Sequence, residues 1–259
     1  MGRLLAMGLV VVVGAAICVF DAAAQPVRTS CPAPGAQAVR LVAGGRHFGG
    51  EVLGQGTVAI AYAHDADSTF CTWQPAALYL ARHGFRVLLF NYPVSPFLSN
   101  TGHYPKGTFR FDLDLAAAVA HLRAGGAKKI VLGGDGVGGI GALAAARTLG
   151  RSVSAVFTLT AGGITGSTDT LGNASLADDL QGLRAVKHLR TPAFFLGGPS
   201  DQNVRALYRA CTSSVKQWRK LPSAAFALDG FGLATWTTNT PATRQVRAAI
   251  VGFLRRESR

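Results

Sequence analysis

The sequence is poor in acidic residues. Only 13 of its 259 residues are Asp or Glu, against 26 Lys and Arg, so its formal net charge is +13. A basic surface attracts anionic polymers, anionic lipid or nucleic acid. The basic residues are nevertheless dispersed along the chain and do not cluster with aromatic side chains. We therefore expect weak polyanion affinity at most and no specific nucleic-acid motif.

Cysteines are also few. The chain has four, none in a C-x-x-C arrangement, and this spacing does not suit a metal site. Neither a metal nor a cofactor is expected. Three cysteines lie beyond the N-terminal segment: Cys31, Cys71 and Cys211. An oxidising compartment permits one disulfide and leaves one thiol, and the spacing leaves the pairing open.

One long apolar run is present, and it lies at the N-terminus. A charged Arg3 precedes an apolar stretch over residues 4–20, and three small residues, Ala22 to Ala24, follow it. This pattern predicts a cleavable signal peptide over residues 1–24 and a single domain over residues 25–259. The protein is then secreted or held in the periplasm or cell envelope. A retained membrane anchor is the alternative, because the run approaches the length of a membrane span.

Beyond that segment, strand-like apolar runs alternate with helical patterns. With 49% hydrophobic residues the chain can build one sizeable core. The alternation predicts an α/β domain with a mostly parallel central sheet and helices on both faces. The expected strands are Val39–Val42, Thr57–Ala63, Arg86–Phe90, Lys129–Leu132, Ala155–Leu159, Ala193–Leu196 and Ala224–Leu228. The expected helices are Trp73–Arg82, Phe109–Leu122, Ile140–Leu149, Leu180–Leu189, Val204–Cys211 and Thr243–Arg256.

A glycine-rich turn follows the strand Lys129–Leu132 and leads into a small-residue helix. A strand, a sharp turn and such a helix form the context of a nucleophile elbow, whose pattern is Gly-x-Ser-x-Gly. Over roughly residues 57–255 the chain resembles the α/β-hydrolase superfamily, particularly small secreted esterases and dienelactone hydrolases. In the register Gly134-x-Gly136-x-Gly138, the resemblance puts Gly136 at the nucleophile position. Glycine has no side chain that can attack a substrate.

Two other interpretations of the same turn remain open. The first places Asp135 at the nucleophile position, as in haloalkane dehalogenases, with Val137 two residues further on. The second is a dinucleotide fingerprint, Gly134-x-Gly136-x-x-Gly139. That fingerprint is weak here, because at least two strands precede it and the next strand ends without an acidic residue.

The loop after strand Thr57–Ala63 begins with His64 and Asp65. The resembling family carries a His-Gly pair here, and this loop helps to form the oxyanion hole, together with the residue after the nucleophile, Val137. A carboxylate at Asp65 opposes a developing oxyanion if it points into the site. It has no such effect if it points to solvent, and the sequence does not decide between the two. For His64 we favour a structural role over a catalytic one.

The remaining triad positions lie further along the chain. The family's histidine commonly stands in Gly-His-Gly after the last strand, where this chain has Phe231 between two glycines. Phenylalanine can neither accept nor donate a proton, so general-base catalysis has no agent there. Asp201 matches the position of the triad acid, although it is equally suited to cap the helix that follows. His103, in the loop after strand Arg86–Phe90, is the best histidine outside the expected positions.

These residues favour a catalytically inactive member of the superfamily, because nucleophile and base are both absent from independently placed motifs. Such a protein is a scaffold that binds an unknown small molecule or a protein partner. The alternative is an active hydrolase that acts on an ester or a related bond with relocated residues such as Asp135 or His64.

Overall fold

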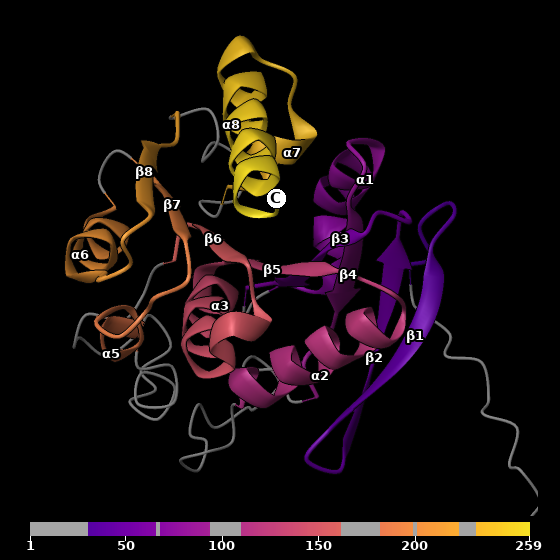
Figure 1. Cartoon of the computed structure of the whole chain (residues 1–259). Coiled ribbons are helices and arrows are strands. Elements are labelled where there is room, and N and C mark those ends of the chain that lie inside the picture. Colours follow the sequence, from indigo (N-terminus) through magenta and orange to yellow (C-terminus); the bar gives the residue numbers. More distant parts are fainter. Residues whose placement is uncertain (1–30, 66–67, 94–109, 162–181, 199–200, 223–231) are drawn as a thin grey trace, which may run out of the picture.

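The computed structural model describes residues 31–65, 68–93, 110–161, 182–198, 201–222 and 232–259. Within them a single eight-stranded sheet runs in the order β1-β2-β4-β3-β5-β6-β7-β8 (Figure 1). β1 and β2 pair antiparallel, as do β2 and β4, and all other neighbours are parallel. The strands are β1 (Gln37–Ala43), β2 (Arg46–Leu53), β3 (Val58–Ala63), β4 (Arg86–Phe90), β5 (Lys129–Asp135), β6 (Ala155–Leu159), β7 (Ala193–Gly197) and β8 (Lys216–Lys220).

Helices cover both faces of the sheet and enclose two hydrophobic cores (Figure 1). One face carries α2 (Phe111–Ala124), α3 (Gly136–Leu149), α5 (Gly182–Val186) and α6 (Gln202–Ala210). The other carries α1 (Gln74–Arg82), α7 (Ala234–Thr237) and α8 (Pro241–Glu257). Two short 3-10 helices, η1 (Phe70–Trp73) and η2 (Gly150–Ser152), complete the described elements. The predicted fold class, a mostly parallel sheet with helices on both faces, is confirmed.

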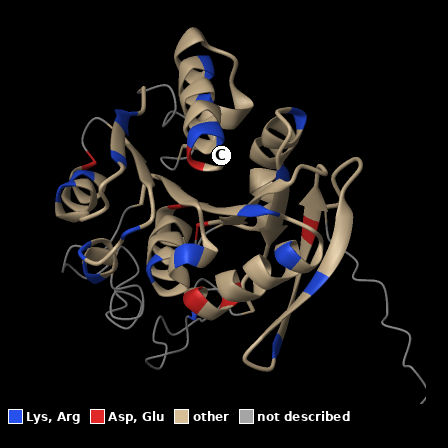
Figure 2. Ribbon diagram, in the orientation of Figure 1, with Lys and Arg blue, Asp and Glu red and all other residues tan. Residues whose placement is uncertain are grey.

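The central strands are buried on both sides, as their continuous apolar runs predict. All five residues of β6 and all five of β7 are buried. None of the described helices combines the length and apolar character needed to cross a bilayer. Lys and Arg lie on most elements of both layers, whereas Asp and Glu are few (Figure 2).

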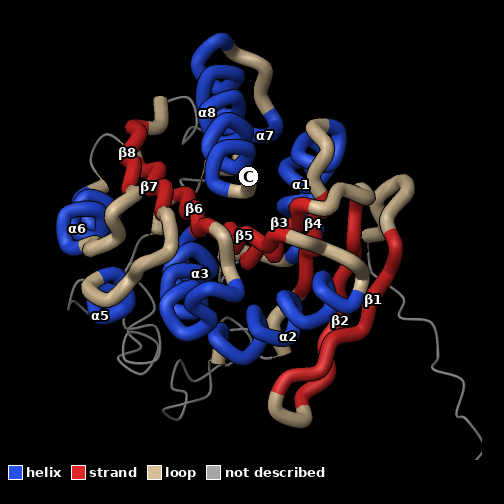
Figure 3. Tube along the Cα trace, viewed as in Figure 1, coloured by secondary structure: helices blue, strands red, loops and turns tan. Residues whose placement is uncertain are grey.

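Two strands were missed by the sequence analysis. β2 pairs with β1 in a long hairpin at one end of the sheet (Figure 3), and its alternating pattern is interrupted by Gly49 and Gly50. β8 lies at the opposite edge of the sheet and is only partly buried. Its sequence, Lys-Gln-Trp-Arg-Lys, contains no apolar run, and it was therefore not predicted as a strand. The expected strand Ala224–Leu228 lies outside the described residues.

Helix α3 begins at Gly136, four residues before the predicted start at Ile140. Its first turn is rich in glycine, which has a low intrinsic helix propensity. Tertiary packing overrides that propensity here, because the turn lies buried against the ends of β3 and β5. Strand β5 is correspondingly longer than predicted and ends at Asp135 instead of Leu132.

A disulfide between Cys31 and Cys71 ties the start of the described chain to η1 and leaves Cys211 as a buried thiol. Buried Glu51 reinforces this connection. Its carboxylate accepts hydrogen bonds from the backbone N–H of Ala33 and from the Gln74 side chain, 2.8 Å away. The N-terminal arm is thus held covalently and by a buried polar network.

We predict that the double substitution Cys31→Ser and Cys71→Ser lowers the free energy of unfolding by about 3–4 kcal/mol. The bridge joins residues 40 positions apart, and removing it restores the entropy of that loop to the unfolded chain. Urea denaturation measures the change. Dithiothreitol should weaken the wild type to the same level and leave the double variant unaffected. Equal stability of both proteins under oxidising conditions would contradict the pairing.

Candidate functional site

The register of the sheet brings two loops together at the carboxyl ends of β3 and β5. Ala63, the last residue of β3, pairs with Gly134 near the end of β5. Consequently the loop that begins with His64 and Asp65 lies directly against the turn into α3. The turn is tight, because a Cβ built on Gly138 would lie 2.3 Å from the carbonyl oxygen of Ala63.

Gly136 forms the apex of this turn. Its φ of +51° lies in the left-handed region that glycine adopts without penalty. Asp135, by contrast, has an extended backbone with φ −127°. The strained conformation that characterises the nucleophile of an elbow is therefore found at residue 136 and not at residue 135.

The Asp65 side chain occupies the space above this apex. Asp65 is only 6% exposed, so it does not point to solvent. A Cβ built on Gly136 would lie 2.1 Å from both Cγ and Oδ1 of Asp65, a separation that atoms cannot adopt without a shift. The carboxylate therefore fills the volume in which a nucleophilic side chain at position 136 would begin.

The same carboxylate accepts a hydrogen bond from the backbone. The N–H of Val137 donates to Asp65 Oδ1 over 2.8 Å. In the resembling family the N–H that follows the nucleophile stabilises the oxyanion of the reaction. Here the carboxyl group of Asp65 already holds that donor.

His64 is buried and neutral. Its Nδ1 lies 2.6 Å from the carbonyl oxygen of Asp65, which can only accept, so Nδ1 carries the proton. Its Nε2 is buried without a hydrogen-bond partner among the described residues. Burial lowers the pKa of His64 to about 4, partly offset by the hydrogen bond to Asp65.

Tyr92 was not singled out from the sequence, yet it completes this cluster. Its ring packs on the His64 ring at a centroid distance of 4.5 Å, and its hydroxyl donates to the carbonyl oxygen of His64 over 2.7 Å. Burial raises the pKa of Tyr92 far above its usual value, and the charges of Asp135, Asp65 and Asp114 add to the shift. Its position two residues after strand β4, at the sheet's carboxyl edge, was the available signal.

The other predicted residues take no part in the hydrogen bond between Val137 and Asp65. Asp135 is completely buried at the end of β5. Asp201 caps α6, because its carboxylate accepts from the backbone N–H of Val204 over 3.0 Å. Phe231 and His103 lie outside the described residues. No cluster of three metal-ligating side chains occurs in the described part of the chain.

The geometry argues against the dinucleotide interpretation. A pyrophosphate in such a site rests on the first N–H groups of the helix that follows the glycines. The carboxylate of Asp65 already accepts from the N–H of Val137 in the first turn of α3. That N–H is therefore already engaged and is not available to a pyrophosphate.

We predict that Gly136→Ala lowers the free energy of unfolding by about 2–4 kcal/mol. Alanine is strained in the left-handed backbone conformation of residue 136, and its Cβ would displace the Asp65 carboxylate from its hydrogen bond. In an Asp65→Ala background the cost should fall by about 1 kcal/mol or more, since the overlap is gone. Chemical denaturation of the four proteins of this cycle gives the coupling. Gly138→Ala is the matched control: its Cβ meets backbone oxygens, so its cost should be the same in both backgrounds. Additive effects of Asp65 and Gly136 would refute the overlap.

We predict that His64 makes stability fall with acidification between pH 6.5 and 4. In that pH range His64 is protonated in the unfolded chain but neutral in the folded protein, because its pKa is about 4 when folded. The loss is on the order of 3 kcal/mol and is complete near pH 4. Urea titrations of wild type and His64→Asn should differ by this amount between pH 7 and 4. The raised pKa of Asp114 acts in the opposite direction, but it is present in both proteins and cancels. Parallel pH profiles would contradict a buried neutral His64.

Comparison with known proteins identifies the fold through solved structures and not through sequence. No protein-family model matches the chain, and no curated protein matches its sequence. Solved structures do resemble it. Dienelactone hydrolase from Anabaena variabilis superposes with a TM-score of 0.62 at 20% identity, over 86% of this chain and 98% of its own. The esterase domain of a Rhodothermus marinus protein gives 0.60 at 19% identity, over 85% and 98%. A soluble variant of monoglyceride lipase from Saccharomyces cerevisiae gives 0.64 at 13% identity, over 90% and 99%. Together with the strand order and the turn after β5, these likenesses show that the chain has the α/β-hydrolase fold.

Proposed function

We propose that this protein is an α/β-hydrolase-family member without serine-hydrolase activity, which serves as a scaffold for a small molecule or a protein partner. The observation that carries the proposal is the Asp65 carboxylate bound to the N–H of Val137 above Gly136. This one side chain occupies the volume that a nucleophile at position 136 would need. It also accepts the hydrogen bond from the N–H that an oxyanion would require.

Electrostatics makes the arrangement unfavourable for acyl transfer. Catalysis in this fold depends on preorganised donors aimed at the charge that develops in the transition state. At this site the donor already has an anionic partner, and a second negative charge would lie beside the first in a buried environment. The transition state would be opposed where an active enzyme stabilises it.

The proton-transfer machinery is also absent from its expected place. Phe231 stands at the family's histidine position in the sequence and has no titratable group. Asp201, at the position of the triad acid, accepts from the backbone of α6. His64, the buried imidazole near the apex, donates its Nδ1 proton to a backbone carbonyl of its own loop.

We further propose that the protein is exported after cleavage of residues 1–24. The disulfide between Cys31 and Cys71 supports an oxidising destination, because such bonds persist outside the reducing cytosol. The apolar run that precedes Ala22 to Ala24 supplies the signal in the sequence.

The proposal predicts no hydrolysis of p-nitrophenyl esters and no labelling by a fluorophosphonate. Turnover that disappears in Asp135→Asn or His64→Asn would contradict it and favour the alternative, a hydrolase with relocated catalytic residues. Labelling of any serine by the probe would contradict it as well.

A gain-of-function series tests the physical reason for inactivity. Gly136→Ser with Phe231→His should remain inactive, because the serine Cβ overlaps the Asp65 carboxylate. Adding Asp65→Gly should create weak esterase activity, about tenfold or more above the matched protein with alanine at position 136. Equal activity with and without the Asp65 substitution would show that the carboxylate does not block the site.

A further inference from the structure

A cavity of about 580 Å³ lies at the amino ends of β6 and β7, on the opposite edge of the sheet from Asp65 and Gly136. Its walls come from the last turn of α3, from η2 and from the segment between α5 and β7. Helix α3 connects the two regions: it starts at Gly136 and ends about 20 Å away, beside the cavity. The cavity is thus a second site, separate from the one that carries the proposed function.

The cavity is lined by cationic side chains and by no acidic ones. Arg147, Arg151 and Arg190 reach it from three different segments, and His188 adds an imidazole. All four residues are exposed. Among the described residues none of these arginines forms an ion pair, whereas Arg46 and Arg110 each pair with an aspartate. Three guanidinium groups therefore line one cavity without a counter-charge from the described fold.

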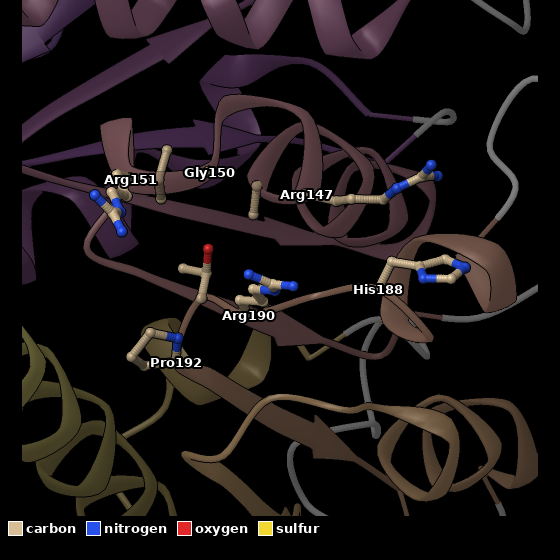
Figure 4. Close-up of a pocket in the computed structure, with 9 residues that line it drawn as sticks. Arg147, Gly150, Arg151, His188, Arg190 and Pro192 are labelled. Atoms are coloured by element: carbon tan, nitrogen blue, oxygen red, sulfur yellow. The ribbon is translucent and has the colours of Figure 1, made fainter.

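The side chains lie around the cavity and not along a flat surface (Figure 4). Arg147 and His188 extend toward the same end of it, Arg190 lies between the two walls, and Arg151 stands at the other end. Ala146, Val153 and Pro192 contribute apolar lining, and Thr191 adds a hydroxyl group. A volume of this size suits a small organic molecule.

Helix electrostatics explains only part of this cluster. Arg147 lies in the last turn of α3, where a cation is favourable. Arg82 in α1 and Arg209 in α6 hold the same kind of position. Arg151 lies in the last turn of η2, which has only three residues and so only a small dipole, and Arg190 lies in the connection before β7, in no helix. Their position beside Arg147 around one cavity requires another reason.

We propose that this cavity binds a small anionic ligand that carries two or more adjacent phosphate groups. Guanidinium groups bind phosphate oxygens through paired, charge-assisted hydrogen bonds, and arginine suits this geometry better than lysine. Three arginines on separate walls match several negative charges on one ligand better than a single ion. The apolar lining accommodates the organic part of such a molecule.

Isothermal titration calorimetry with inorganic pyrophosphate and tripolyphosphate, at constant ionic strength, tests the site on the full folded protein. We expect wild-type binding, and a Kd raised about tenfold or more by Arg147→Gln, Arg151→Gln and Arg190→Gln together. The matched control is Arg40→Gln, Arg82→Gln and Arg209→Gln. It removes the same charge from exposed positions, two of them in last helical turns, and should change the Kd less than about twofold.

Two outcomes would overturn the proposal. One is the absence of pyrophosphate and tripolyphosphate binding by the wild type. The other is an equal loss of affinity in both triple variants, which would show that the net charge of +13 attracts the anion without a defined site. Circular dichroism confirms that each variant is folded before it is titrated. Because neither result bears on ester hydrolysis, this test is independent of the proposed function.

Discussion

The hydrogen bond from the backbone N–H of Val137 to the carboxylate of Asp65 organises the carboxyl edge of this sheet. It joins the loop after β3 to the first turn of α3, two segments 72 residues apart. The bond forms because the register of β3 and β5 places Ala63 beside Gly134, and because glycines let helix and loop approach closely. The burial of His64 and its contact with Tyr92 follow from the same loop position.

This interaction stabilises the first turn of α3. The N-terminus of a helix carries a partial positive charge and unsatisfied N–H groups, so a carboxylate there is favourable. Here Asp65 satisfies one of them, and a glycine at position 136 makes room for its carboxyl group. Under the proposed function, this donor is thereby withheld from a transition state. Gly136 and Asp65 are therefore compatible, because the carboxyl group of Asp65 fits here only when position 136 has no Cβ.

Much of the fold follows from local patterns. The buried runs of β3, β4, β5, β6 and β7 mark a parallel sheet, and the glycine-rich turn after β5 marks the edge at which the site lies. The sequence could not decide the direction of Asp65, because that depends on strand register and on contacts distant in the chain. The same applies to the pairing of Cys31 with Cys71 and to the contact of Tyr92 with His64. β8 escaped prediction because an edge strand with charged residues lacks the apolar run that marks an interior strand.

The central claim is that the Asp65 carboxylate holds the Val137 amide in the resting protein. Amide hydrogen exchange measured by NMR tests it directly, at the Val137 N–H in the wild type and in Asp65→Ala. The account predicts a slowly exchanging Val137 amide in the wild type, and exchange faster by about tenfold or more once its acceptor is removed, with the amides in the middle of α3 unchanged. A Val137 amide that exchanges at the same rate in both proteins would contradict the account.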